Sequence, residues 1–274
     1  MADFATDTAV AGGGGRFRAR LSPDWEVWGP NGGYLAALAL RAAGAATELP
    51  RPAGISCHFL SVARFEAVDL CVTPLHAGKR AASLRVSMQQ AERPILEALV
   101  WVVGRVDGLR HDLDDMPEVP PPERLPSIED LLPPEERAPY RFWDNIERRP
   151  IDWVHPRAWQ PGLPPTFRSW FRFRPRAIFD DPFLDAARAL LLIDTLLWPA
   201  AWQRHGDGSG FIAPNLDVTA RFHHLPATPW LLAAASAPVA AEGLIGGEAR
   251  VWSSDGRLVA SGGGQLLCRP VPSP

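Results

Sequence analysis

The 274-residue sequence predicts an α+β fold in which one helix and a set of antiparallel strands occur twice. The matched segments are 32–44 with 194–206, 57–70 with 220–232, and 93–98 with 256–261. Their offsets are 162, 163 and 163 residues, and such a constant offset indicates an internal repeat.

Each half is expected to begin with a helix. The first covers 32–44 (GGYLAALALRAAG), where two glycines precede a run of small apolar residues. Glycine costs backbone entropy in a helix, so its place here indicates that something approaches the backbone closely. The second helix is expected at 194–206, with Pro199 near its start.

Strands separated by turn signals are expected around the helices. In the first half they cover 68–75, 81–90 and 95–104, and in the second half 216–223, 230–239, 245–254 and 257–268. The sequence Ser254-Asp255-Gly256-Arg257 predicts a hairpin turn. Opening strands are expected in 17–28, 140–149 and 167–175, where aromatic and charged residues alternate.

A proline-rich stretch from Pro117 to Pro165 lies between the halves, and its density of proline excludes long helices and central strands. The expected organisation is therefore a first domain at 16–110, a linker at 111–139 and a second domain at 140–270.

Composition narrows the classes of function. A net charge of −3 and a pI near 6.2 exclude a basic nucleic-acid surface. Three scattered cysteines indicate reduced thiols, and no apolar run reaches the roughly 20 residues of a membrane span. The N-terminus lacks signal-peptide character, so a soluble, cytoplasmic protein is expected. No histidines have the spacing of metal ligands, and neither a metal nor a cofactor is predicted.

The stretches GGYLAALAL, HFL and DGRLVAS…Q, in this order, resemble the type II acyl-CoA thioesterases of the thioesterase-like superfamily. The resemblance implies a double hotdog, in which two fused antiparallel sheets each wrap a central helix. It also implies an acyl-CoA substrate and a homodimer. The reaction in that family is hydrolysis without a covalent enzyme intermediate, by a water that a carboxylate, a hydroxyl or amide residue and a glutamine orient.

The family's catalytic positions fall on Asp194 and Asn215, but its glutamine position falls on Gly264. Gln265 lies one residue later, and a slip of one residue turns a strand side chain to the opposite face. A bulge within 262–264 would restore the facing, and Gln265 is the third predicted catalytic residue on that condition.

The residues themselves support a site at Asp194, because the apolar run 190–193 would desolvate its carboxylate and raise its pKa. The alternative is an Asp that caps the helix. Asn215, Asp217 and Thr219 are expected on one strand face, either in the site or towards solvent.

The start of the first helix is the predicted substrate-binding region. Backbone N–H groups at Asn31, Gly32 and Gly33 would face the thioester carbonyl and stabilise the developing oxyanion, with Tyr34 beside them. His58 is expected either to line the cleft or to be structural. Its neighbour Cys57 would point to the opposite strand face, so the two cannot form a catalytic dyad.

Two other functions remain open. A non-catalytic protein that binds acyl groups or acyl-CoA on a thioesterase scaffold would explain the displaced glutamine. A hotdog hydratase or dehydratase would need a histidine five residues after an aspartate, and no aspartate in the sequence has one.

Overall fold

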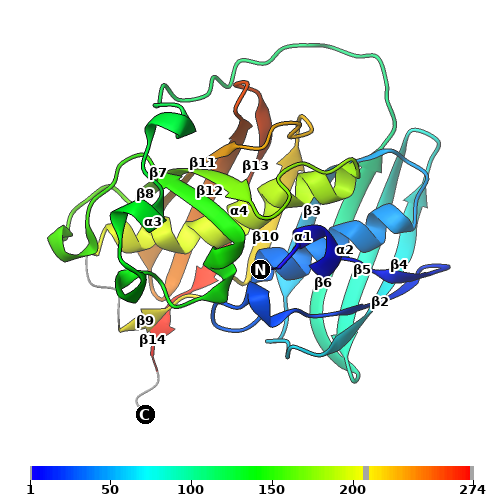
Figure 1. Ribbon diagram of the computed structural model, residues 1–274. Helices are drawn as coiled ribbons and strands as arrows, with labels where there is room; N and C mark the ends of the chain where they lie inside the picture. Colours follow the sequence, from blue (N-terminus) through cyan, green and yellow to red (C-terminus); the bar gives the residue numbers. More distant parts are fainter. Residues whose placement is uncertain (1, 206–209, 272–274) are drawn as a thin grey trace.

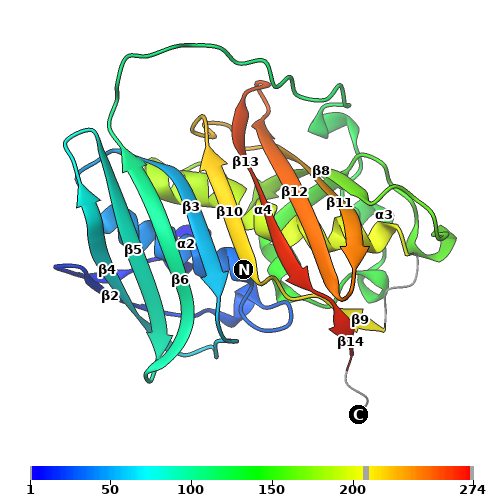
Figure 2. The same cartoon turned by 180° about the vertical axis from the view of Figure 1, so that it is seen from behind.

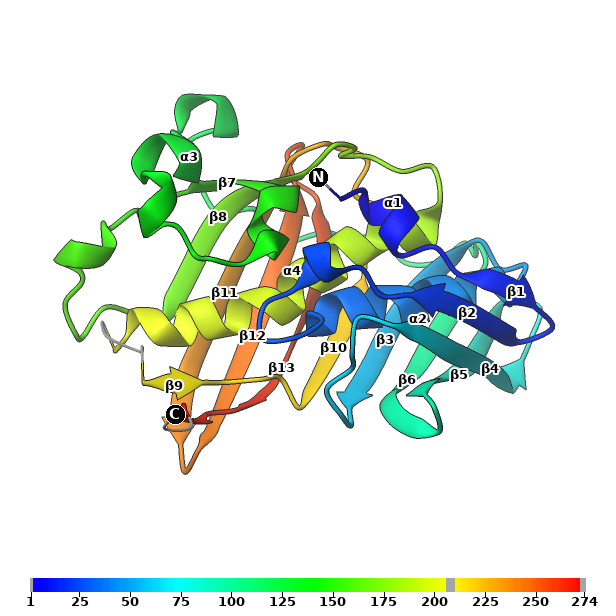
Figure 3. The same cartoon turned by 60° about the horizontal axis from the view of Figure 1, so that its bottom comes forward.

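The computed structural model describes residues 2–205 and 210–271 (Figure 1). A 12-stranded antiparallel sheet curves around two central helices, as Figures 1 and 3 show. The α-helices are α1 (Phe4–Asp7), α2 (Gly32–Ala45), α3 (Ile128–Leu131) and α4 (Pro182–Gln203). The first-half strands are β1 (Ala11–Gly13), β2 (Arg16–Arg20), β3 (Arg51–Phe59), β4 (Ala67–Ala77), β5 (Ala81–Gln90) and β6 (Arg93–Val103). The later strands are β7 (Ile146–Pro150), β8 (Thr166–Phe173), β9 (Phe211–Ile212), β10 (Asp217–Phe222), β11 (Leu231–Ala241), β12 (Leu244–Ser253), β13 (Leu258–Leu267) and β14 (Arg269–Pro270).

The large sheet has the strand order β1-β2-β4-β5-β6-β3-β10-β13-β12-β11-β8-β7. The two halves join where β3 pairs with β10 in the middle of the sheet (Figure 2). Ser56 there pairs with Thr219, 163 residues later, and their hydroxyl oxygens lie 3.4 Å apart. Because 163 is also the offset of the repeat, equivalent residues meet at the junction. The predicted α+β double hotdog is confirmed.

The predicted first helix is confirmed as α2, but the second helix begins earlier than expected. Its cap is Asp181, whose carboxylate accepts hydrogen bonds from N–H groups of the first turn, and Pro182 follows. This is a favourable helix start, because proline at the first position loses no hydrogen bond. Asp194 therefore lies in the interior of α4, and its interpretation as a cap was wrong.

Pro199 lies inside α4 without ending it. The helix runs to Gln203, because its apolar side chains pack between α2 and the second half of the sheet. The last residue of the predicted helix, at position 206, lies outside the described residues.

The strand predictions hold in most places, with three differences. The predicted strand at 17–28 ends at Arg20, because Pro23–Trp25 forms a 3-10 helix. The turn at 254–257 is confirmed, and Gly256 has the positive φ of 90° that such a turn requires. The segment 140–149 is a strand only from Ile146 onwards, because Arg141–Asn145 forms the 3-10 helix η4. The bulge predicted within 262–264 is absent, since these residues pair with β12 in continuous register.

The predicted linker at 111–139 crosses the outer face of the second half of the sheet before η4. Two tryptophans hold it there: the indole N–H of Trp252 donates to Asp114 O at 3.1 Å, and that of Trp170 donates to Pro120 O at 3.0 Å. These rings, with Trp230, form a small apolar cluster under the segment. Part of the tryptophan content is therefore structural.

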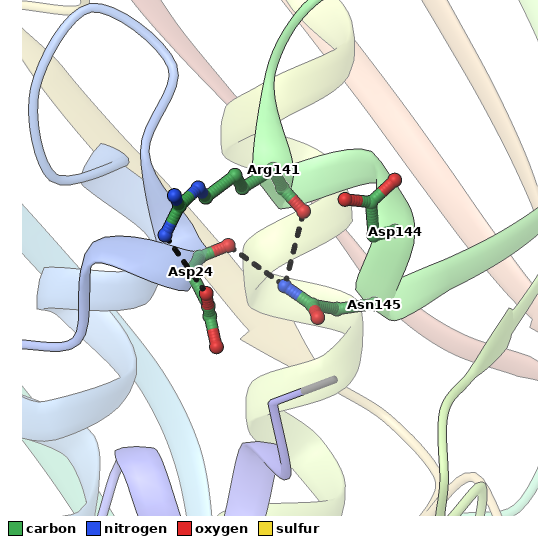
Figure 4. Close-up of a pocket in the computed structure, with 4 residues that line it drawn as sticks. All are labelled: Asp24, Arg141, Asp144 and Asn145. Carbon is green, nitrogen blue, oxygen red and sulfur yellow. Dashed lines mark hydrogen bonds and ion pairs between the residues drawn. The ribbon is translucent and has the colours of Figure 1, made fainter. Parts of the chain in front are cut away.

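A hollow of about 260 Å³ lies between η4 and the 3-10 helix η1 (Pro23–Trp25) of the first half (Figure 4). Three of its four lining residues contact one another: Asn145 Nδ2 donates to Asp24 O at 2.7 Å, and the Arg141 guanidinium lies 3.7 Å from the Asp24 carboxylate. We interpret these contacts as a structural link between the halves.

Among the described residues, no helix combines the length and the apolar character that crossing a bilayer requires.

Candidate active site

The strongest candidate for a catalytic group is Asp194, at the point where α2, α4 and the central strands meet. Asn215, just before β10, donates from Nδ2 to Asp194 Oδ1 at 2.6 Å and to its main-chain oxygen at 2.8 Å. The N–H of Gly33 donates to Asp194 Oδ2 at 2.6 Å. Each carboxylate oxygen is thus held by one donor from a different segment.

Burial dominates the electrostatics of Asp194, which is only 4% exposed. Loss of hydration raises the pKa of its carboxyl to about 7, although the hydrogen bonds from Asn215 and Gly33 favour the ionised form and oppose the shift. A carboxyl that titrates near neutral pH is suited to accept a proton and release it again.

The glycines at the start of α2 permit this close approach. A Cβ on Gly32 would lie 3.0 Å from both carboxylate oxygens of Asp194, and one on Gly33 would lie 2.7 Å from Leu191 Cα. The Gly32 contact is tighter than most Cβ contacts, and the Gly33 contact is too short for any side chain. The glycines therefore let α2 pack directly against α4 and let a main-chain donor reach the carboxylate.

Other predicted binding residues at the start of α2 are engaged within the protein. Asn31 caps the helix: its Oδ1 accepts from Tyr34 N at 3.0 Å, and its Nδ2 donates to Thr195 Oγ1 at 3.2 Å. The Tyr34 ring is fully buried against Trp25, and its hydroxyl donates to a main-chain oxygen at 2.8 Å. Burial raises the pKa of that hydroxyl, and its position argues against contact with substrate.

The predicted polar face of Asn215, Asp217 and Thr219 does not exist as a single face. The chain bends at Leu216, so Asn215 points to Asp194, whereas Asp217 and Thr219 lie on the outer face of β10. Only Asn215 of the three contributes to the group around Asp194.

Gln265 lies on the outer face of β13, away from Asp194. It is exposed while its neighbour Leu266 is fully buried, and its N–H donates to Asp217 Oδ1 at 2.6 Å. The residue at the family's glutamine position is Gly264, where a Cβ would lie 2.3 Å from Asp217 O. The condition for a catalytic Gln265 is not met.

We predict that Gln265→Ala leaves kcat and KM of the thioester hydrolysis that the resemblance implies unchanged, because the side chain lies on the opposite face of the sheet. Asn215→Ala is the contrasting variant. It removes a donor to a buried carboxylate, worth about 1.5–3 kcal/mol or a tenfold to 100-fold loss in kcat/KM. Steady-state kinetics on both variants would show whether the two side chains differ as their positions require.

His58 and Cys57 point to opposite faces of β3, as expected. Cys57 is fully buried, and burial together with the nearby Asp194 charge raises the pKa of its thiol, so it stays protonated. His58 is exposed on the outer face, in register with Asp217 and Glu97. This placement contradicts a role in lining a cleft at Asp194.

Thr195 is a residue beside Asp194 that the sequence analysis does not single out. Its hydroxyl oxygen accepts a hydrogen bond from Asn31, the cap of α2. Two signals were available: the residue directly follows Asp194, and Pro199 stands four positions later.

The other features of the described chain show no second candidate centre. In residues 2–205 and 210–271, no three His, Cys, Asp or Glu side chains form a group that would hold a metal ion. A hollow of about 610 Å³ lies at the start of the predicted linker, lined by His111, Asp112, Leu113, Asp114, His223, His224, Arg250 and Leu258. Neither this hollow nor the one in Figure 4 includes Asp194.

The fold and the site define a double-hotdog protein with a buried carboxylate where its halves meet. Models of the acyl-CoA thioesterase domains match both halves: the N-terminal domain model covers residues 21–103, and the C-terminal domain model covers 113–265. The chain belongs to the acyl-CoA thioesterase family.

Solved structures share the fold over almost the whole chain. An acyl-CoA thioesterase II from Mycobacterium marinum has a TM-score of 0.81 at 22% identity, covering 99% of both chains. A TesB protein from Mycobacterium avium subs paratuberculosis has a TM-score of 0.78 at 23% identity, covering 98% of both. A hot dog protein of unknown function from Alicyclobacillus acidocaldarius has a TM-score of 0.82 at 23% identity, covering 100% of both.

Proposed function

We propose that this protein hydrolyses an acyl-CoA thioester to the free acid and CoA, with Asp194 as the general base. The observation that carries the proposal is the Asp194 carboxyl, buried, held by Asn215 and Gly33, and shifted to a pKa of about 7. Membership of the acyl-CoA thioesterase family supports the same reaction.

In the proposed reaction a water attacks the thioester carbon and gives a proton to Asp194. A C–O bond forms, and the carbonyl electron pair moves to oxygen as an oxyanion. When the oxyanion collapses, the C–S bond breaks and the CoA thiolate leaves. It takes the proton from Asp194, which restores the carboxylate without a covalent enzyme intermediate.

The test is the release of free thiol from a panel of acyl-CoA substrates that differ in chain length and branching. The proposal expects steady turnover of at least one of them. A protein that binds acyl-CoA but releases no thiol from any member of the panel would contradict it.

The pH dependence is a sharper prediction. General-base catalysis needs the ionised carboxylate, so kcat/KM is expected to rise with pH through about 7 and to level off above it. At pH 5 the ionised fraction falls to roughly 1%, so kcat/KM should be about 100-fold below the plateau. Initial rates from pH 5 to 9 in buffers of constant ionic strength measure this. A flat profile would remove Asp194 as the titrating base.

A non-catalytic acyl-CoA-binding protein is the second candidate. The observation that favours it is Gly264 at the position where the family has its glutamine, because no side chain there can help to orient a water. The same panel distinguishes the two, since a binding protein shows affinity without turnover. A homodimer that acts in the cytoplasm also remains a proposal, which light scattering and cell fractionation would test.

A further inference from the structure

The donors nearest Asp194 are engaged by the carboxylate itself. The side-chain amide of Asn215 donates twice to Asp194, and the N–H of Gly33 donates once. Gln265 lies on the outer face of the sheet. A hydrolytic site still needs a donor for the thioester carbonyl oxygen, because negative charge develops there in the transition state.

Two donors at the same end of α2 remain free. The N–H of Gly32, the first residue of the helix, has no acceptor among the described residues. The Thr195 hydroxyl oxygen accepts from Asn31 Nδ2 at 3.2 Å, and within the described part of the chain its own proton has no acceptor. Since Asn31 directly precedes Gly32, this hydrogen bond brings the hydroxyl to the start of α2.

Thr195 also lies at a partly exposed position of α4. It is half-buried, whereas the preceding Asp194 and the following Leu196 and Leu197 are buried. Pro199 has no N–H, so the main-chain oxygen of Thr195 lacks its usual helical donor. Thr195 is therefore partly accessible, next in sequence to the buried Asp194.

We propose that Thr195 is a further catalytic residue, an inference that rests on the hydrolysis proposed above. Its hydroxyl donates to the thioester carbonyl oxygen together with the N–H of Gly32. Asn31 holds the hydroxyl oxygen, which leaves the O–H directed away from Asn31. Thr195 keeps its proton throughout, while Asp194 exchanges one with the attacking water and the leaving thiolate.

The test compares Thr195→Val with Thr195→Ser. Valine has nearly the same shape without the hydroxyl, so kcat is expected to fall about 100-fold, as for the loss of one oxyanion donor. KM is expected to change little, because the contact strengthens only in the transition state. Serine keeps the hydroxyl and should retain most of kcat. In Thr195→Val the rise of kcat/KM near pH 7 should persist, because the hydroxyl does not contact Asp194.

A purely structural role makes different predictions. If Thr195 only supports the cap of α2, Thr195→Val and Asn31→Ala would lower the melting temperature alike, and kcat of the folded Thr195→Val would stay at the wild-type value. That kcat would overturn the inference while leaving the thioesterase intact. A wild-type protein without turnover would instead overturn the proposed function and the inference with it. Should Thr195→Val fail to fold, Thr195→Ala removes the same hydroxyl with less bulk.

Discussion

Asp194→Asn is expected to lower kcat about 1,000-fold, which is the middle of the range for loss of a general base. Asparagine has the shape of aspartate but cannot accept a proton from water. Its amide would still lie between Asn215 and Gly33, with one N–H group directed at a donor. Thiol release from the best substrate of the panel measures the effect.

Asp217→Asn is the matched control for this substitution. Asp217 lies two residues beyond Asn215 but on the outer face of the sheet, where its Oδ1 accepts from the N–H of Gln265. An asparagine oxygen can accept the same bond, so activity should be retained. Equal losses in Asp194→Asn and Asp217→Asn would show that neither carboxylate is the base.

The wild type and Asp194→Asn are also expected to differ in how their stability depends on pH, an effect of burial that is independent of catalysis. Burial raises the pKa of Asp194 from 3.8 to about 7, so between these values the native state holds a proton that the unfolded chain has released. The free energy of unfolding of the wild type therefore falls as pH rises from about 4 to 7, by an amount on the order of 4 kcal/mol. Asp194→Asn lacks this dependence, and urea unfolding at several pH values would reveal the difference.

The duplicated α+β organisation could be predicted because the offset of the repeat is nearly constant, and the double hotdog was implied by the resemblance to type II acyl-CoA thioesterases. That offset also placed Gly32 opposite Asp194, and the structure brings a Gly32 Cβ position within 3.0 Å of the carboxylate. At a junction of two similar halves, equivalent positions meet. Repeat alignment is therefore informative about contacts there, even where few residues are identical.

The face of the sheet on which an individual side chain lies was harder to predict than the fold. Alternation along a strand assumes regular pairing, and the bend at Leu216 breaks it, so Asn215 turns inward while Asp217 turns outward. At Gln265 the prediction of a bulge among the glycines is wrong. In the structure they permit regular strands to approach so closely that a Cβ on Gly262 would lie 1.9 Å from Thr219 O.

The predicted start of the second helix at 194 is too late, because the repeat alignment places it opposite the start of α2 at Gly32. The signal for its true beginning was present, since Asp181 and Pro182 form a favourable cap and first position. Tyr34 is a second difference. Its place next to the two glycines predicts a role in binding, but its ring stacks on Trp25 and its hydroxyl donates to Asp7 O.

Gly33→Ala is expected to damage stability and activity together. Its Cβ would lie 2.7 Å from Leu191 Cα, a main-chain atom that cannot move without the whole helix. Separating α2 from α4 should cost about 3 kcal/mol, at the upper end of the range for overpacking, and should lengthen the bond from Gly33 N to Asp194. The loss of kcat is expected to persist at temperatures where the variant is fully folded.

Gly44→Ala tests whether that loss is specific to the site. It adds the same methyl group to the same helix, but its Cβ would meet the ring of Phe183, 2.6 Å from Cγ, far from Asp194. A side-chain ring can shift where a main chain cannot, so Gly44→Ala should be less destabilising and should keep kcat. If the loss of kcat in Gly33→Ala and Gly44→Ala simply followed the loss of unfolding free energy, the contact at Gly33 would matter for packing only. A kcat loss confined to Gly33→Ala would tie catalysis to the direct approach of α2 to the carboxylate.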